Sequence, residues 1–314
     1  DMPAEFPWSG STLSASVYCT DNVDVDELQF YYRKFENSTW SSSATSHNSD
    51  TFSVEITKTM IGTQGIQYYF RAEDSSGNAD STDNYTLTFT YEGNALDLPT
   101  LKFGTTVDKY EIISVPIDLD NKAVTSVLDE LGTYDDRYWR VFHYLNGENK
   151  EYNDGFTNFE PAKGYWLIMR NSTSLQIGPG KALPVADDGS YSLTLKPGYN
   201  QVGNPFLFDI NWDNVLAANN NQDVGRLLLF SSNDFTEGAT LSRFKGGFVY
   251  VDGSADVNIT INPSLDGGAR IQSGSPFEKL SEKAIDGTKW TVPIVINNEL
   301  ITNRLSGIGM HETA

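Results

Sequence analysis

Two matched stretches decide the fold of this chain: Tyr110-Glu-Ile-Ile-Ser-Val-Pro116 and Tyr199-Asn-Gln-Val-Gly-Asn-Pro205. A tyrosine, an aliphatic residue and a proline recur in them at a constant offset of 89 residues. Each stretch precedes a short helical pattern, a strand pattern and a closing run of lysine, glycine and aromatic residues. The closing runs are Lys163-Gly-Tyr-Trp-Leu-Ile168 and Lys245-Gly-Gly-Phe-Val-Tyr250. Four matched features in one order predict an internal duplication.

The duplication places its two copies at about residues 109–168 and 198–251, within a β-rich domain predicted to span residues 100–275. One half-sheet would leave an apolar face exposed, and a second related half can cover it. We therefore expect a mostly antiparallel domain with short helices. The matched residues build sheets and turns, so they predict an architecture and not a reaction.

Composition narrows the class of protein. The 314 residues suit two or three domains, and a 12% aromatic content favours strands. The net charge is -20 and no Lys/Arg cluster is present, which argues against nucleic acid as a partner. The sequence contains no run of 18 apolar residues, so we expect no membrane span. We also find no signal peptide, and both ends read as cut from a longer polypeptide. Other domains of that polypeptide are therefore expected partners.

Residues 1–95 alternate strand and turn patterns, which predicts a β-sandwich. Two stretches within them are Thr20-Asp-Asn-Val-Asp-Val-Asp-Glu-Leu-Gln-Phe-Tyr-Tyr-Arg33 and Gln67-Tyr-Tyr-Phe-Arg-Ala-Glu-Asp-Ser-Ser-Gly-Asn78. They resemble the immunoglobulin-like or fibronectin-III-like modules of bacterial surface and secreted proteins. The resemblance implies the sandwich fold and an extracellular or cell-surface location. Such modules mostly act as spacers or binding platforms.

The duplicated region resembles a β-rich module of large extracellular proteins of Bacteroidota. The resemblance rests on the two opening stretches, on Trp139-Arg-Val-Phe-His-Tyr144 and on Phe159-Glu-Pro-Ala-Lys-Gly-Tyr-Trp-Leu-Ile168. It implies secretion by a Gram-negative bacterium and implies no reaction. Residues 276–314 read as strands of a further domain or as a C-terminal extension.

Standard catalytic motifs are absent from the sequence. Its three histidines lie far apart, and no zinc, serine-hydrolase or phosphate-loop signature occurs. Cys19 is the only cysteine, so no internal disulfide can form, and we expect a structural thiol. We therefore predict no enzyme and no cofactor, with calcium as the one exception considered.

The calcium hypothesis concerns two loops of the predicted sandwich. Hard cations need several oxygen ligands, and acidic and amide side chains cluster in these loops. The candidate ligands are Asp21, Asp24, Asp26, Asp74 and Asn78. The alternative interpretation is a pair of turns stabilised by their own Asp and Asn side chains.

A second hypothesis concerns aromatic residues of the duplicated region that could stack on sugar rings if they were exposed. They are Trp139, Tyr165, Trp166, Trp212 and Tyr250. The alternative is core packing, because about half of the residues in a strand point inward.

These observations favour a non-catalytic extracellular module that acts in adhesion, display or spacing within a larger bacterial surface or secreted protein. A cell-surface glycan or protein would be its partner. The alternative is an accessory glycan-binding or orienting region of a secreted hydrolase whose catalytic domain lies elsewhere. An unrecognised hydrolase within residues 100–275 is a third reading.

Overall fold

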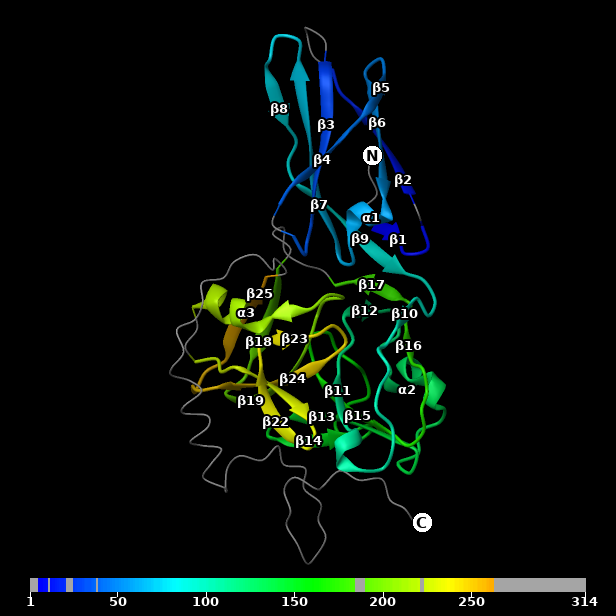
Figure 1. Ribbon diagram of the computed structural model, residues 1–314, viewed down its shortest axis with the longest axis vertical. Coiled ribbons are helices and arrows are strands. Elements are labelled where there is room, and N and C mark those ends of the chain that lie inside the picture. The colour runs from blue at the N-terminus through cyan, green and yellow to red at the C-terminus, as the bar shows by residue number, and fades with distance from the viewer. Residues whose placement is uncertain are drawn as a thin grey trace, which may run out of the picture.

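The computed structural model describes residues 5–10, 12–20, 25–37, 39–183, 190–220 and 223–262. An elongated β-sandwich stands above a broader β-rich body (Figure 1). Nearly all strand pairs are antiparallel, and the helices are short, so the predicted all-β class is confirmed. The expected strands at 276–314 lie outside the described residues. No helix in the described part is long and apolar enough to span a membrane.

The sandwich has the immunoglobulin-like arrangement of two facing sheets. One sheet has the order β2-β6-β5 and the other contains the order β9-β7-β3-β4, with β1 parallel to β9 and β8 beside β7. This separation of strands matches the sheet composition of immunoglobulin-type sandwiches. The strands are β1 (Glu5–Pro7), β2 (Thr12–Tyr18), β3 (Val25–Lys34), β4 (Ser41–Ala44), β5 (Ser46–Asn48), β6 (Thr51–Thr57), β7 (Gly65–Asp74), β8 (Ala79–Ser81) and β9 (Tyr85–Tyr91).

Alternating side chains explain how the two sheets pack. In β6, Phe52, Val54 and Ile56 are buried, while the residues between them are partly or fully exposed. In the opposite sheet, Phe30 of β3 and Phe70 of β7 are buried, with ring centroids 5.3 Å apart. Removing these apolar faces from water stabilises the sandwich. The single turn α1 (Lys58–Ile61) covers one end of this core.

The lower body contains two sheets of the same strand order. The first is β11-β15-β13-β14 and the second is β19-β24-β21-β22. The first comprises β11 (Glu111–Ile113), β13 (Trp139–Leu145), β14 (Glu148–Glu151) and β15 (Tyr165–Met169). The second comprises β19 (Gly198–Gly203), β21 (Leu227–Ser231), β22 (Asp234–Gly238) and β24 (Gly246–Val251). Along the chain, α2 (Val124–Val127) lies between β11 and β13, and α3 (Trp212–Asn219) lies between β19 and β21. The two sheets of the body thus have matching strand orders, as the predicted duplication requires.

The two halves exchange equivalent backbone hydrogen bonds. The Ser114 N–H donates to the Phe244 carbonyl at 2.9 Å, and the Gly203 N–H donates to the Ala162 carbonyl at 2.8 Å. Ser114 and Gly203 occupy equivalent positions in the two copies, because each lies two residues before the matched proline. Their acceptors also match, since both precede a Lys-Gly pair and both adopt a left-handed conformation, with φ of 59° and 62°. The halves are thus related by an approximate two-fold rotation.

Shorter elements complete the body. They are β10 (Leu96–Asp97) paired with β16 (Gln176–Ile177), β12 (Ile117–Leu119) paired with β17 (Gly180–Ala182), β18 (Tyr191–Leu195) paired with β25 (Val257–Ile261), β20 (Ile210–Asn211) paired with β23 (Thr240–Leu241), and the 3₁₀ turns Val107–Lys109 and Asp129–Leu131.

Candidate functional site

Four of the five predicted stacking residues are core residues, so the predicted stacking face is wrong for them. Trp139, Tyr165, Trp166 and Trp212 are each at most 1% exposed, and only Tyr250 remains partly exposed. They are not gathered on one surface, because Trp212 belongs to the core of the second half and the other three to the first.

The cause is that β15 is covered on both faces. Every residue from Tyr165 to Met169 is buried. Trp166 meets Phe230 of the second half at 4.8 Å between centroids, whereas Tyr165 meets Phe159 at 4.6 Å on the opposite side. An alternating strand exposes half of its residues only when one face is open to solvent, and neither face of β15 is.

The predicted calcium ligands are only partly described. The Asp74 carboxylate accepts from the Ser76 N–H, the Asn78 N–H and Asn78 Nδ2, each at 2.8 Å. These hydrogen bonds, chiefly that from the Asn78 side chain, lower the pKa of Asp74. This is the self-stabilised turn of the alternative interpretation.

The structure does bring Asp26 to the same end of the sandwich as that turn. Strand pairing shifts between Val25 and Glu27, which leaves Asp26 exposed in a bulge near Asp74. Asp21 and Asp24 lie outside the described residues. Among the residues that are described, no group of three His, Cys, Asp or Glu could hold a metal ion. The calcium site stays a prediction.

His143 is buried in the first half, on the same side of the sheet as Tyr165. Its Nδ1 is 2.9 Å from the Gly164 carbonyl, and its ring centroid is 4.7 Å from that of Tyr165. Burial lowers the pKa of His143 to about 4, and Lys163 acts in the same direction. The neighbouring Tyr144 N–H donates to Gln201 Oε1 at 2.8 Å, which ties this strand to the second half. The position is that of a structural histidine.

The junction between sandwich and body is a shared sheet. Strand β17 of the body pairs with β9 of the sandwich, with Gly180 opposite Tyr91 and Lys181 opposite Thr90. Strand β12 pairs with β17 in turn, so one sheet runs from the body to the far edge of the sandwich. Lys181 Nζ also lies 2.7 Å from Glu5 Oε1 on β1. Backbone hydrogen bonds therefore connect the two domains.

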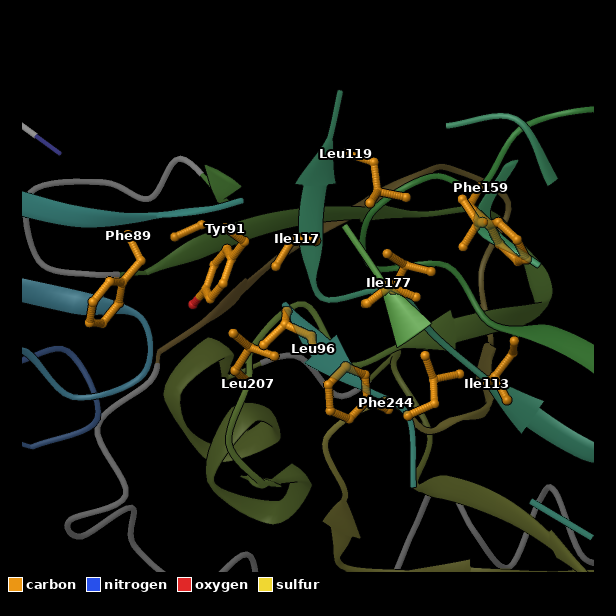
Figure 2. Close-up of a cluster of buried hydrophobic side chains, with 14 of the residues drawn as sticks. Phe89, Tyr91, Leu96, Ile113, Ile117, Leu119, Phe159, Ile177, Leu207 and Phe244 are labelled. Atoms are coloured by element: carbon orange, nitrogen blue, oxygen red, sulfur yellow. The ribbon is translucent and has the colours of Figure 1, made fainter. Parts of the chain in front are cut away.

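Apolar side chains fill the same junction. Phe89 and Tyr91 from β9 lie near Ile117 of β12, and Leu96, Ile177 and Leu207 continue the cluster into the body (Figure 2). All six are buried. The Tyr91 hydroxyl donates to the Thr63 carbonyl at 2.7 Å, which holds this ring in place. Residues 92–99, which connect the two domains, are mostly exposed but are anchored in this core by the buried Leu96 and Leu98.

Exposed and partly exposed aromatic residues occur instead on the outer face of the sandwich, where the sequence did not predict a site. Tyr31, Arg33, Trp40, Gln67 and Tyr69, which we call the aromatic face, come from β3, from β7 and from the residue before β4. Trp40 is exposed, Tyr31, Arg33 and Tyr69 are partly exposed, and Gln67 is buried. Tyr31 and Tyr69 are opposite each other in the ladder and stack at 4.9 Å with an interplanar angle of 3°.

The remaining members of the aromatic face also contact one another. Trp40 meets Tyr69 at 4.9 Å and 69°, and the Arg33 guanidinium lies 5.2 Å from the Trp40 ring centroid. Arg33 also donates to Gln67 Oε1 at 2.7 Å. The signal in the sequence was the strict alternation around Phe30 and Phe70, because the residues next to a buried aromatic in a strand point outward.

Comparisons with known proteins give no family. No protein-family description matches the chain, and no curated protein matches it. Two solved structures are similar to it. One is a cycloalternan-degrading enzyme from Trueperella pyogenes, with 11% identity and a TM-score of 0.23, covering 54% of this chain and 31% of that one. The other comprises the FN1-FN3 domains of chicken CNTN1, with 10% identity and a TM-score of 0.23, covering 80% of this chain and 95% of that one.

Neither likeness carries an argument about this chain at that TM-score. The strand pairing itself defines the class: an all-β protein in which an immunoglobulin-like or fibronectin-III-like sandwich is joined to a β-rich body with two sheets of matching strand order.

Proposed function

We propose that this chain is a non-catalytic, extracellular module of a larger bacterial surface or secreted protein, in which it acts in display, spacing or adhesion. The shared sheet at the junction carries the proposal. A rigid spacer must hold its two ends in a fixed relative orientation, and the pairing of β9, β17 and β12 fixes the orientation of the sandwich relative to the body.

The buried cluster at the junction supports the same role. Domains joined by an exposed linker usually move relative to one another. Here Tyr91, Leu96 and Ile117 lie in one continuous core that extends from the sandwich into the first half of the body. Separating the domains would expose these side chains to water, at about 25 cal/mol for each Å² of apolar surface.

Two further observations support the non-catalytic, extracellular reading. His143, the histidine with the strongly lowered pKa, is enclosed between aromatic rings and a backbone carbonyl. The net charge of -20 keeps an exposed module soluble and repels anionic surfaces. The location itself follows the resemblance of the sequence to surface and secreted modules.

The spacing role predicts one well-defined distance between the domains. With Cys19 replaced by serine, spin labels at Tyr18→Cys on the sandwich and Tyr138→Cys on the body would report it, because both tyrosines are more than half exposed. We expect a narrow distance distribution from double electron–electron resonance. A broad distribution in the wild-type background would contradict a rigid spacer.

A matched pair of variants assigns the rigidity to β17. A Cβ at Gly180 would lie 2.6 Å from the Asp118 carbonyl oxygen, so Gly180→Val should displace β17 from β12 and broaden the distribution. A Cβ at Gly253 meets nothing within 4 Å, so Gly253→Val is the control. Turnover of polysaccharide or peptide substrates by the purified chain would overturn the non-catalytic assignment.

A further inference from the structure

The aromatic face has the composition of a binding surface and not of a core. Cross-strand partners share one side of a sheet, so the partners of Tyr31 in the neighbouring strands, Ser42 and Tyr69, lie on the outer side with it. Trp40 is 37% exposed even though Arg33 and Tyr69 contact its ring. Phe30 and Phe70 point into the core shared with the β2-β6-β5 sheet, so the residues that alternate with them lie on the opposite side of β3 and β7.

We propose that the aromatic face binds a neutral saccharide chain of pyranose units. The C–H groups of a pyranose form an apolar face that packs on an aromatic ring, and the polar edge of an aromatic cluster can bind the hydroxyls. Trp40 supplies the exposed ring. Arg33 supplies N–H donors, and its position against Trp40 and Gln67 holds both the donors and the ring in a fixed orientation.

The surroundings of the rings favour a saccharide over a protein partner. On the β4 and β9 sides the aromatic face is flanked by small hydroxylated residues: Ser42 is opposite Tyr31 in β4, and Thr86 is opposite Gln67 in β9. The next cross-strand pair on the same face, Gln29 and Arg71, is polar, and Arg71 is paired with Glu73 at 2.9 Å. Three partly covered rings offer on the order of a few hundred Å². A stable protein interface takes roughly 800 Å² from each partner and is rich in apolar area at its centre. A patch this small, bordered by hydroxyl and other polar groups, matches a few sugar rings.

Charge selects a neutral chain. The protein carries a net charge of -20, which repels polyanions such as uronic-acid polymers at long range. The Arg33 guanidinium is already held by the Trp40 ring and the Gln67 amide oxygen, and Arg71, which follows Tyr69 on the same face, is paired with Glu73. Sugar hydroxyls can accept from its remaining N–H groups without requiring a second charge.

The test applies the full-length chain to an array of neutral oligosaccharides built from glucose, galactose, mannose and N-acetylglucosamine, with glucuronate oligosaccharides for comparison. Calorimetry then measures the neutral oligosaccharide with the strongest signal. We expect Trp40→Ala to weaken that binding at least tenfold. Tyr138→Ala, which removes an exposed tyrosine from the other domain, should change it less than twofold.

A second variant tests the site without removing a native ring. Ser42 is exposed beside Tyr31, so Ser42→Trp should cover the aromatic face and abolish binding while the melting temperature stays within a few degrees. The proposal is overturned if the wild type binds no neutral oligosaccharide, if it prefers glucuronate chains, or if both Trp40→Ala and Ser42→Trp bind normally. None of these outcomes alters the distance between the domains, so the spacing role is judged separately.

Discussion

The two halves of the body share a strand order but have different roles in the core. The first half belongs to one core with the sandwich, whereas most of the buried side chains of the second half form a core of their own. In the first half, the segment after the matched proline is β12, which pairs with β17 and joins the sheet of the sandwich. The equivalent segment of the second half, Phe206–Phe208, forms no strand.

This difference shows how a repeat can be specialised without altering its sheet. The second half carries the longer helix, α3, whose N-cap Asn211 accepts from the Asn214 N–H at 3.2 Å. The equivalent N-cap in the first half is Ala123, which has no capping side chain, and α2 ends after one turn. The first half gains its stability from the sandwich, and the second half from its own helix and core.

The largest expected loss of stability comes from substitutions that each disturb only one of the two cores. Val124 and Trp212 occupy equivalent positions in the two copies. The Val124 N–H donates to the Thr157 carbonyl at 2.9 Å, and the Trp212 N–H donates to the Ala239 carbonyl at 2.7 Å. Each acceptor directly precedes the residue that pairs with the N-cap of the helix. Both are fully buried. We expect Trp212→Ala to lower the free energy of unfolding by about 3–5 kcal/mol, and Val124→Ala by about 2 kcal/mol.

Hydrogen exchange read by mass spectrometry would measure these effects segment by segment. With Trp212→Ala, protection should fall mainly in β18, α3 and β25. With Val124→Ala, it should fall in the first half and in β9. Equal loss throughout the chain in both variants would show a single cooperative core and contradict the comparison.

His143 should make the stability of the first half depend on pH, whereas the second half has no titratable side chain at the equivalent position. Its counterpart in the second half is Leu229, since Phe142 and Leu228 pair with the equivalent Trp166 and Phe248. The folded pKa of about 4 is below the usual 6.5, so the neutral form is favoured by folding. The stability is complete above pH 6.5 and is lost as the pH falls toward 4, by up to about 3 kcal/mol.

Replacing His143 by leucine would make the two halves alike at this position. We expect urea unfolding of His143→Leu between pH 7 and pH 4 to lose the part of the pH dependence that belongs to this group. Glu160, whose pKa is lowered chiefly by its hydrogen bond with Lys163, should keep its own contribution. A pH profile identical to the wild type would show that His143 is not the titrating group.

The smallest effect tests the contact between the halves. A Cβ at Gly203 would lie 2.4 Å from the Lys163 carbonyl oxygen and 2.5 Å from Ser114 Cβ. Gly203→Ala should therefore push the halves apart at a cost of about 1–3 kcal/mol. For Gly253→Ala, on an open turn, the free energy of unfolding should stay within about 0.5 kcal/mol of the wild-type value. Thermal unfolding of the two variants side by side would measure the difference.

Part of this molecule follows from local sequence patterns. The all-β class follows from alternation in segments such as Thr51–Thr57, whose inward residues are the apolar ones. The recurrence of Tyr110 and Pro116 at Tyr199 and Pro205 pointed to two halves because the spacing of turns fixes where strands begin. These signals lie within one strand or one repeat.

The remainder depends on contacts between distant segments. Gly180-Lys181-Ala182 has no strand pattern of its own and becomes β17 because β9 and β12 are beside it. Tyr69 and Trp166 both lie in aromatic-rich strands, yet Tyr69 is partly exposed and Trp166 is buried. The reason is that β15, which contains Trp166, is covered on both faces, whereas the outer face of β7, which contains Tyr69, is not. Whether an aromatic residue can meet a ligand is decided by that covering layer, which its own strand does not encode.

The reciprocal bonds between Ser114 and Phe244, and between Gly203 and Ala162, have a consequence for the origin of the chain. A polypeptide with one copy would present a donor and an acceptor that it could not join to each other. Two such molecules would satisfy them across a symmetric dimer. Joining two such copies in one chain would turn an association that depends on concentration into a permanent intramolecular one, and would leave one copy available to attach the sandwich.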